Sequence, residues 1–181
     1  MRELKYHEKK LLKKVDFFDW KLDDNDREIK IMRRYYVQKR EDLKYYSKLV
    51  GKLRRIIYKL KALDKDDLFR IRQTKLLMNK LYDMGILNYK TNLEDVEKKV
   101  NVSAFCRRRL PVVLFRNKYC ETMKEAVTFV EQSQIRVGVD VINNPAFIVT
   151  RSMEDHITWT EGSKIKKKLE EYNGTKDDYN E

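Results

Sequence analysis

Basic side chains recur at helical spacing in the middle of the chain, and residues of this type can bind the phosphate groups of a polyanion. Between residues 43 and 63, five cations follow in steps of three or four: Lys44, Lys48, Lys52, Arg55 and Lys59. No Asp or Glu occurs there, so this line lacks the opposite charges that normally stabilise a solvated helix face. A bound polyanion would relieve the repulsion, and nucleic acid is the commonest one. The spacing favours nucleic-acid contact over a solvated face or a membrane-surface or calmodulin-type helix.

A second basic cluster lies close to the N-terminus. Its members are Lys9, Lys10, Lys13 and Lys14. They accompany apolar residues at helical spacing, which predicts a short helix with a basic side. A localisation signal or a basic arm is an alternative interpretation, because short basic runs are poorly specific.

The net charge of +12 is concentrated in the first half of the 181 residues. The first hundred residues contain 28 Lys and Arg against 17 Asp and Glu, whereas the remaining 81 contain 13 against 12. This asymmetry indicates that the N-terminal half supplies most of the attraction for an anionic partner.

Candidate residues for catalysis are scarce. The two cysteines (Cys106, Cys120) and two histidines (His7, His156) do not have the spacing of zinc ligands. The five glycines are isolated, so neither a GxxxxGK nor a GxGxxG phosphate loop is present. No apolar run reaches the roughly 18 residues of a transmembrane helix. We therefore expect no enzyme, cofactor, metal, small-molecule substrate or membrane partner.

The elements that must position the basic residues are mostly helical. An apolar stripe at steps of three and four predicts a long helix over residues 43–63: Leu43, Tyr46, Val50, Leu53, Ile57 and Leu60. Asp66 or Asp67 can begin the next helix, and Gly85 is well placed to end it.

The pattern changes after residue 100 to two helices followed by short strands. Ser103 can cap a helix, and Pro111 predicts a kink or a new helix start. Thr122 and Glu125 form a capping box for a further helix. Period-two patterning predicts four strands at residues 135–137, 139–142, 146–150 and 156–159. On the first helix we expect Arg109 and Arg116 to flank the apolar side and Arg107 and Arg108 to point outward.

Two stretches of this module resemble a known family. Residues 106–116 (CRRRLPVVLFR) and 121–159 (ETMKEAVTFVEQSQIRVGVDVINNPAFIVTRSMEDHITW) resemble the S4-like RNA-binding domain of a small-subunit ribosomal protein family. Residues 39–69 (KREDLKYYSKLVGKLRRIIYKLKALDKDDLF) and 84–87 (MGIL) resemble that family outside the domain. Residues 4–21 (LKYHEKKLLKKVDFFDWK) and 102–113 (VSAFCRRRLPVV) are similar to its nucleolar paralogues, the S4-domain subunits of the U3 small nucleolar ribonucleoprotein.

The resemblance implies a non-catalytic factor of early ribosome assembly, located in the nucleus and nucleolus within the small-subunit processome. Such a protein binds U3 small nucleolar RNA and precursor ribosomal RNA and promotes their pairing. The implied protein partners are a scaffold of the M-phase phosphoprotein type and a Brix-domain sister subunit. Two alternatives stay open: a structural protein of the mature small subunit, and, less favoured, an enzyme with an appended S4-like domain.

The resemblance also implies an RNA face on the S4-like domain. Its candidate residues, with the flanking Arg116, are Arg107, Arg108, Arg109, Arg116, Thr122, Lys124, Gln132, Gln134 and Arg136. The neutral Gln132-Ser133-Gln134 stretch departs from the basic or His residues of the ribosomal pattern, which puts direct phosphate contact by this loop in doubt.

The expected fold class is α+β and mostly helical, with N-terminal helices and an S4-like RNA-binding domain of two helices and a small antiparallel sheet. The expected regions are a basic arm or helix (residues 1–25), a helical ribosomal-protein-like region (26–100), the S4-like domain (101–160) and a charged tail (161–181).

Overall fold

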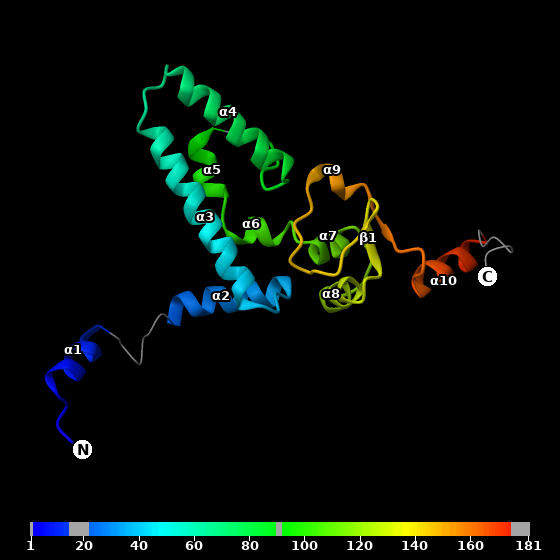
Figure 1. The fold of residues 1–181 in the computed structure, drawn as a ribbon, viewed down its shortest axis with the longest axis horizontal. Coiled ribbons are helices and arrows are strands. Elements are labelled where there is room, and N and C mark those ends of the chain that lie inside the picture. The colour runs from blue at the N-terminus through cyan, green and yellow to red at the C-terminus, as the bar shows by residue number, and fades with distance from the viewer. Residues whose placement is uncertain (1, 15–21, 90–91, 175–181) are drawn as a thin grey trace.

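The computed structural model describes residues 2–14, 22–89 and 92–174. Over these residues the chain forms ten helices and three short strands, in agreement with the expected mostly helical α+β class (Figure 1). The N-terminal helices are α1 (Tyr6–Lys14), α2 (Leu22–Tyr35), α3 (Arg40–Lys61), α4 (Leu68–Asp83), α5 (Leu93–Lys99) and α6 (Val102–Cys106). The expected division between residues 25 and 26 therefore falls inside α2.

The long helix α3 organises the N-terminal core. Its buried residues are the six of the predicted stripe: Leu43, Tyr46, Val50, Leu53, Ile57 and Leu60. Helices α2, α4, α5 and α6 all pack on α3 (Figure 1). The helical periodicity thus predicted correctly which side of α3 faces the protein interior.

The ends of α4 follow the predicted signals. The Asp67 side chain accepts a hydrogen bond from the Phe69 amide at 2.9 Å, which caps the first turn. Gly85 follows the C-cap Met84 and has a φ of +70°, a conformation that glycine adopts without steric cost.

The C-terminal half contains α7 (Leu110–Arg116), α8 (Met123–Glu131), β1 (Ile135–Val137), β2 (Asp140–Val141), α9 (Arg151–Glu154), β3 (Ile157–Trp159) and α10 (Lys164–Asn173). The predicted capping box is present at α8, where the Thr122 hydroxyl accepts from the Glu125 amide and the Glu125 carboxylate accepts from the Thr122 amide. Pro111 lies in the first turn of α7 and marks a new helix start, as expected. Ser103, however, is not a cap: the Asn101 side chain caps α6 by accepting from the Ala104 amide.

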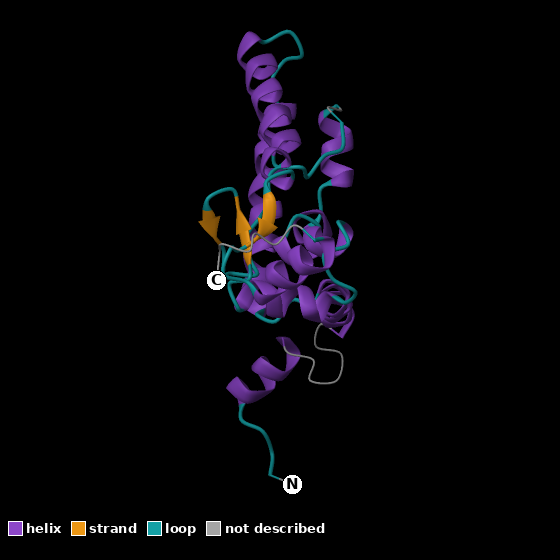
Figure 2. Ribbon diagram, turned by 90° about the vertical axis from the view of Figure 1, so that its right-hand side faces the viewer, coloured by secondary structure: helices purple, strands orange, loops and turns teal. Residues whose placement is uncertain are grey.

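The sheet has three antiparallel strands in the order β2-β1-β3, and they lie side by side in Figure 2. The third of the four expected strands, at residues 146–150, is wrong. Both edges of β1 are occupied by β2 and β3, and the 147–149 backbone bonds instead to residues 108–110 at the start of α7. The Leu110 amide donates to the Phe147 carbonyl, and the Val149 amide donates to the Arg108 carbonyl, both at 2.8 Å. This leaves an isolated bridge between Arg109 and Ile148 in place of a strand.

The buried residues form two cores that divide between Cys106 and Leu110. The first core includes Phe105 and Cys106 of α6, and α6 packs on α3. The second core is built from α7, α8 and the sheet. Residues 101–106, which we expected in the S4-like module, therefore pack with the N-terminal helices, because their apolar side fits against α3.

Candidate nucleic-acid interface

The cationic line of α3 lies on the solvent side of the helix. All five predicted residues are exposed: Lys44, Lys48, Lys52, Arg55 and Lys59. None of the five forms an ion pair with another described residue. At roughly 1.5 Å per residue the line extends over more than 20 Å of α3. It is therefore a continuous cationic surface whose charges are not neutralised within the described part of the chain.

The N-terminal lysines belong to α1, the short helix that the sequence predicts. Lys9 and Lys10 are exposed. The side chains of Lys13 and Lys14 lie outside the described part of the structure. Phosphate binding by this cluster stays a prediction.

Arg108 is buried, so the expectation that it points outward is wrong. Its side chain is 6% exposed and reaches from the start of the S4-like module to the loop after α4. Nε donates to the Val149 carbonyl at 2.9 Å, and Nη1 donates to the Glu154 carboxylate at 2.9 Å. The guanidinium also lies against Gly85, in space that a β-carbon at Gly85 would occupy. These contacts give Arg108 a structural role between the two cores.

Arg109 is also buried, at 3% exposure, and it contacts α3 of the first core. Nη1 donates to the Asp42 carboxylate of α3 at 3.3 Å, and the guanidinium lies 5.9 Å from the centre of the Tyr46 ring. The Tyr46 hydroxyl in turn donates to the Ala146 carbonyl at 3.2 Å. Arg109 is therefore buried and paired with Asp42 inside the protein, which does not suit it to bind a phosphate at the surface.

Arg151 is a junction residue that sequence reasoning missed. Its Nε donates to the Tyr82 carbonyl at 2.8 Å, and its Nη2 donates to the Leu87 carbonyl at 2.7 Å. The guanidinium also stacks on the Tyr82 ring, 4.2 Å from its centre. No local pattern identifies this role, because the partners lie more than 60 positions away in the sequence.

Burial at this junction also makes the Tyr46 hydroxyl and the Cys106 thiol less reactive as nucleophiles. Burial raises the pKa of the Tyr46 hydroxyl to about 12, although the nearby Arg109 acts in the opposite direction. Burial likewise raises the pKa of the Cys106 thiol to about 11. Both groups are therefore protonated at neutral pH, and a thiol in this form is a poor nucleophile. No group of three His, Cys, Asp or Glu suited to a metal occurs among the residues that the structure describes.

The remaining predicted RNA-contact residues on the S4-like module differ in their exposure and in the bonds that they already make. Arg107, Lys124 and Gln132 are exposed. Arg116 is half-exposed and bonds to the Glu154 carboxylate. Arg136 donates to the Thr158 hydroxyl at 2.9 Å and to the Glu161 carboxylate at 2.8 Å.

The polar candidates lie at opposite ends of α8. Thr122 is exposed and its hydroxyl is used in the capping box at the start of α8. Gln134 lies beyond the other end, where its side-chain amide donates to the Gln132 carbonyl at 3.3 Å. The candidate face is therefore spread along α8 and is not gathered into one site.

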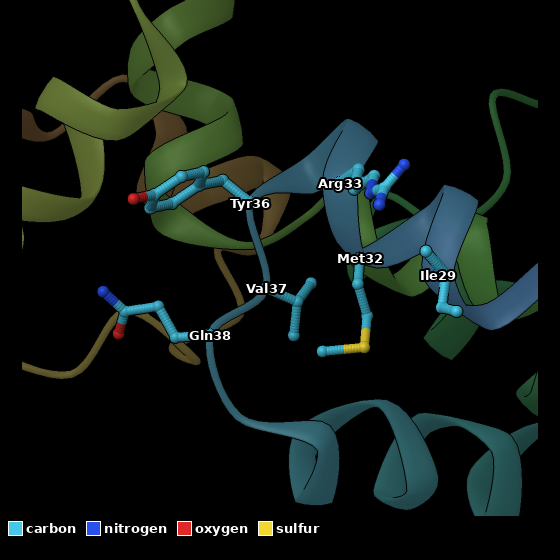
Figure 3. A pocket seen from close by; sticks show the side chains of 6 residues that line it. All are labelled: Ile29, Met32, Arg33, Tyr36, Val37 and Gln38. Atoms are coloured by element: carbon cyan, nitrogen blue, oxygen red, sulfur yellow. The ribbon is translucent and has the colours of Figure 1, made fainter.

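A pocket of about 530 Å³ at the end of α2 has a different character (Figure 3). It is lined by Ile29, Met32, Arg33, Tyr36, Val37 and Gln38. Figure 3 shows Met32 and Val37 pointing toward α3. Its mainly apolar lining does not suit a phosphate group. No helix among the described residues is long and apolar enough to cross a membrane.

Comparison with known proteins assigns both halves of the chain. A ribosomal protein S4/S9 N-terminal domain model matches residues 3–107, and an S4 domain model matches residues 108–155. The chain is 50% identical over 179 residues to the U3 small nucleolar ribonucleoprotein protein IMP3 of Saccharomyces cerevisiae, covering 99% of this chain and 98% of the relative. It is 45% identical over 180 residues to the Homo sapiens protein of the same name, covering 99% and 97%.

A ribosomal protein is a more distant relative. The small ribosomal subunit protein uS4 of Picrophilus torridus is 30% identical over 167 residues, covering 90% of this chain and 91% of the relative. The two family models meet between residues 107 and 108, where the two cores also divide. The chain therefore belongs to the IMP3 family of U3 small nucleolar ribonucleoprotein proteins, which shares its S4 domain with the ribosomal protein uS4.

Proposed function

We propose that this protein is a non-catalytic RNA-binding subunit of a U3 small nucleolar ribonucleoprotein and acts in early assembly of the small ribosomal subunit. Family membership supports the assignment to this particle, since relatives named as U3 small nucleolar ribonucleoprotein proteins match nearly the whole chain. The observation that carries RNA binding is the exposed cationic line of α3, which has no Asp or Glu between residues 43 and 63.

The proposed mechanism is electrostatic. The α3 line, helped by the α1 lysines, binds phosphates without reading sequence, and the S4-like module recognises the shape of a helical or junction RNA. Two RNA strands repel each other through their phosphates. A protein that neutralises part of that charge on both strands promotes their pairing without ATP.

The proposed RNA contacts on the S4-like module are its exposed polar side chains. Among them Arg107 and Lys124 have no ion-pair partner in the described part of the chain, whereas Arg116 and Arg136 would exchange a carboxylate partner for a phosphate. Arg108 and Arg109 support the interface from inside by fixing the module against the N-terminal helices.

The finer assignments of the family are part of the proposal. We place the protein in the nucleolus with U3 small nucleolar RNA and precursor ribosomal RNA as its ligands. We assign it two protein partners, a scaffold of the M-phase phosphoprotein type and a Brix-domain sister subunit. The apolar pocket at the end of α2 offers a surface for such a protein contact.

A second candidate is a structural protein of the mature small subunit, and the similarity to uS4 favours it. Ultraviolet crosslinking in cells, followed by sequencing of the attached RNA, separates the two. Reads on U3 small nucleolar RNA and precursor spacers are expected for an assembly factor. Reads confined to mature ribosomal RNA would instead identify a ribosomal protein.

The α3 surface has its own binding test. Lys48→Glu with Lys52→Glu should weaken RNA binding and reduce the slope of log affinity against log salt by about two, since each phosphate contact contributes about 0.7 to 0.9. The matched control is Lys167→Glu with Lys168→Glu on α10, which makes the same change in charge on exposed residues. If both variants reduce the slope equally, α3 has no special role. An unchanged slope in the α3 variant would mean that this line faces protein.

A further inference from the structure

A polar pocket of about 560 Å³ lies at the junction between the two cores. Its walls come from the loop after α4, the end of α5 and the segments that flank α6 and α7. Because residues from both family-matched regions line it, it exists only when the two halves are packed together.

The pocket is strongly cationic. Five charged side chains line it: Lys98, Lys99, Arg107, Arg108 and Arg116. No Asp or Glu is among the described residues that line it. Two carboxylates outside the lining contact these cations: Glu154 bonds to two of the arginines, and Asp95 lies 3.5 Å from Lys99. The remaining excess of positive charge favours an anionic ligand.

Arg108 lines the pocket and has one donor nitrogen without a partner among the described residues. Its guanidinium is held by the Val149 carbonyl and the Glu154 carboxylate, yet its Nη2 is buried with no hydrogen-bond partner among the described residues. A buried donor without a partner is costly, so nearly all such groups in folded proteins have an acceptor. Nε and Nη1 already have acceptors, so Nη2 is the nitrogen of this guanidinium that a phosphate oxygen would satisfy, through a charge-assisted hydrogen bond.

An exposed aromatic ring lies beside these cations. Tyr89 lines the same pocket, and the residue is 60% exposed. Lys99 Nζ lies over the ring, 4.8 Å from its centre, and donates to the Tyr89 hydroxyl at 3.3 Å. Bases of single-stranded RNA stack on aromatic side chains of this kind, while a basic groove holds the backbone.

We propose that this junction pocket binds a backbone phosphate of an unpaired RNA nucleotide whose base stacks on Tyr89. The inference rests on the RNA-binding function proposed above and adds a specific ligand element to it. It also assigns RNA contact to Lys98, Lys99 and Tyr89, which lie outside the S4 domain.

The test uses the full chain and a fluorescent oligouridylate of about 12 nucleotides, a length within reach of one binding groove. Lys98→Gln with Arg107→Gln removes two exposed pocket charges, and Lys167→Gln with Lys168→Gln is the control of equal charge. The pocket variant should bind about tenfold more weakly than wild type, and the control within about twofold. Both variants should unfold at the wild-type temperature, because the replaced side chains are exposed.

The ring has a separate readout. Tyr89→Ala should weaken oligouridylate binding by about tenfold, whereas Tyr89→Phe keeps the ring and should stay within about twofold. Neither substitution should change the affinity of the protein for a fully paired RNA duplex, whose bases are not free to stack on the ring. Ultraviolet crosslinking and mass spectrometry should place a uridine adduct on Tyr89, an outcome that a merely structural role for the ring does not produce.

Three results would overturn the inference while leaving the proposed function intact. In the first, wild type binds oligouridylate and the pocket variant binds it as tightly as the control does. In the second, the pocket variant loses only the binding of inorganic phosphate, so the source of the anion is not RNA. In the third, it loses only the binding of an acidic peptide. Failure of wild type to bind any RNA would refute the proposed function itself.

Discussion

Replacing Gly85 by alanine should destabilise the junction for two separate physical reasons. Gly85 has a φ of +70°, where an L residue with a side chain is strained. An added β-carbon would also lie 2.7 Å from both Cζ and Nε of Arg108, closer than real contacts allow. Arg108 cannot simply move aside, because it is buried and bonded to Val149 and Glu154.

Two other glycines separate the strain from the contact. Gly138 has a φ of +64° but nothing within 4 Å of its added β-carbon, so Gly138→Ala should cost only the backbone strain of about 1 kcal/mol. Gly51 lies within α3 with nothing within 4 Å, so Gly51→Ala should stabilise by about 0.5 to 1 kcal/mol. Gly85→Ala should cost about 2 to 4 kcal/mol, because displacing Arg108 weakens charge-assisted hydrogen bonds in addition to the strain.

Urea unfolding followed by far-ultraviolet circular dichroism gives the three free energies of unfolding under one set of conditions. The expected order of stability is Gly51→Ala, wild type, Gly138→Ala and then Gly85→Ala. A loss at Gly85 no larger than the loss at Gly138 would show that Arg108 moves without cost. That result would refute the claim that this arginine is fixed between the cores.

Two further predictions concern the ion pairs of the junction. Asp42→Ala leaves the Arg109 guanidinium, only 3% exposed, without its carboxylate, and should lower the free energy of unfolding by about 2 to 4 kcal/mol. Adding Arg109→Met to the Asp42→Ala chain removes the unpaired charge and should recover part of that loss in urea unfolding. No recovery would contradict the idea that the loss comes from a buried unpaired charge. Burial acts to raise the pKa of Glu154, but hydrogen bonds from Arg108 and Arg116 outweigh it and lower that pKa. A lowered pKa in the folded state stabilises the fold above the unfolded value of about 4.3 and loses that effect as the pH falls. Urea unfolding of Glu154→Gln should therefore show a smaller loss of stability on acidification than wild type, and an equal loss would count against this pairing.

The helical half could be predicted from the sequence because its signals are local. The burial of α3 follows from residues three and four positions apart, and that spacing is enough to identify both the apolar and the cationic side. The capping box of α8 and the glycine that ends α4 are signals of the same kind, contained within a few residues. Each depends on backbone geometry that neighbouring residues determine.

The junction could not be predicted in this way because its determinants are distant in sequence. Arg108 and Arg109 follow each other in a basic run that resembles an RNA-binding surface, yet both are buried by partners from other elements. The missing strand has the same cause: residues 147–149 have strand-like composition, but their backbone bonds to residues 108–110. Neither the arginine contacts nor this backbone pairing produces a periodic pattern in the sequence from which it could be predicted.

Because Arg108 and Arg109 are buried inside the protein, they are not available to attract RNA, and the proposed RNA affinity depends on other cations. The sequence after residue 100 contains 13 Lys and Arg against 12 Asp and Glu, so it has almost no net charge. Arg108 and Arg109 are buried at the junction, and Arg116 and Arg136 bond to carboxylates, which leaves few free cations on the S4-like module. The α3 line has no such internal partners among the described residues. If the protein binds RNA as proposed, the non-specific phosphate attraction should come mainly from the N-terminal helices, while the module, fixed to them by its buried arginines, should contribute shape and position.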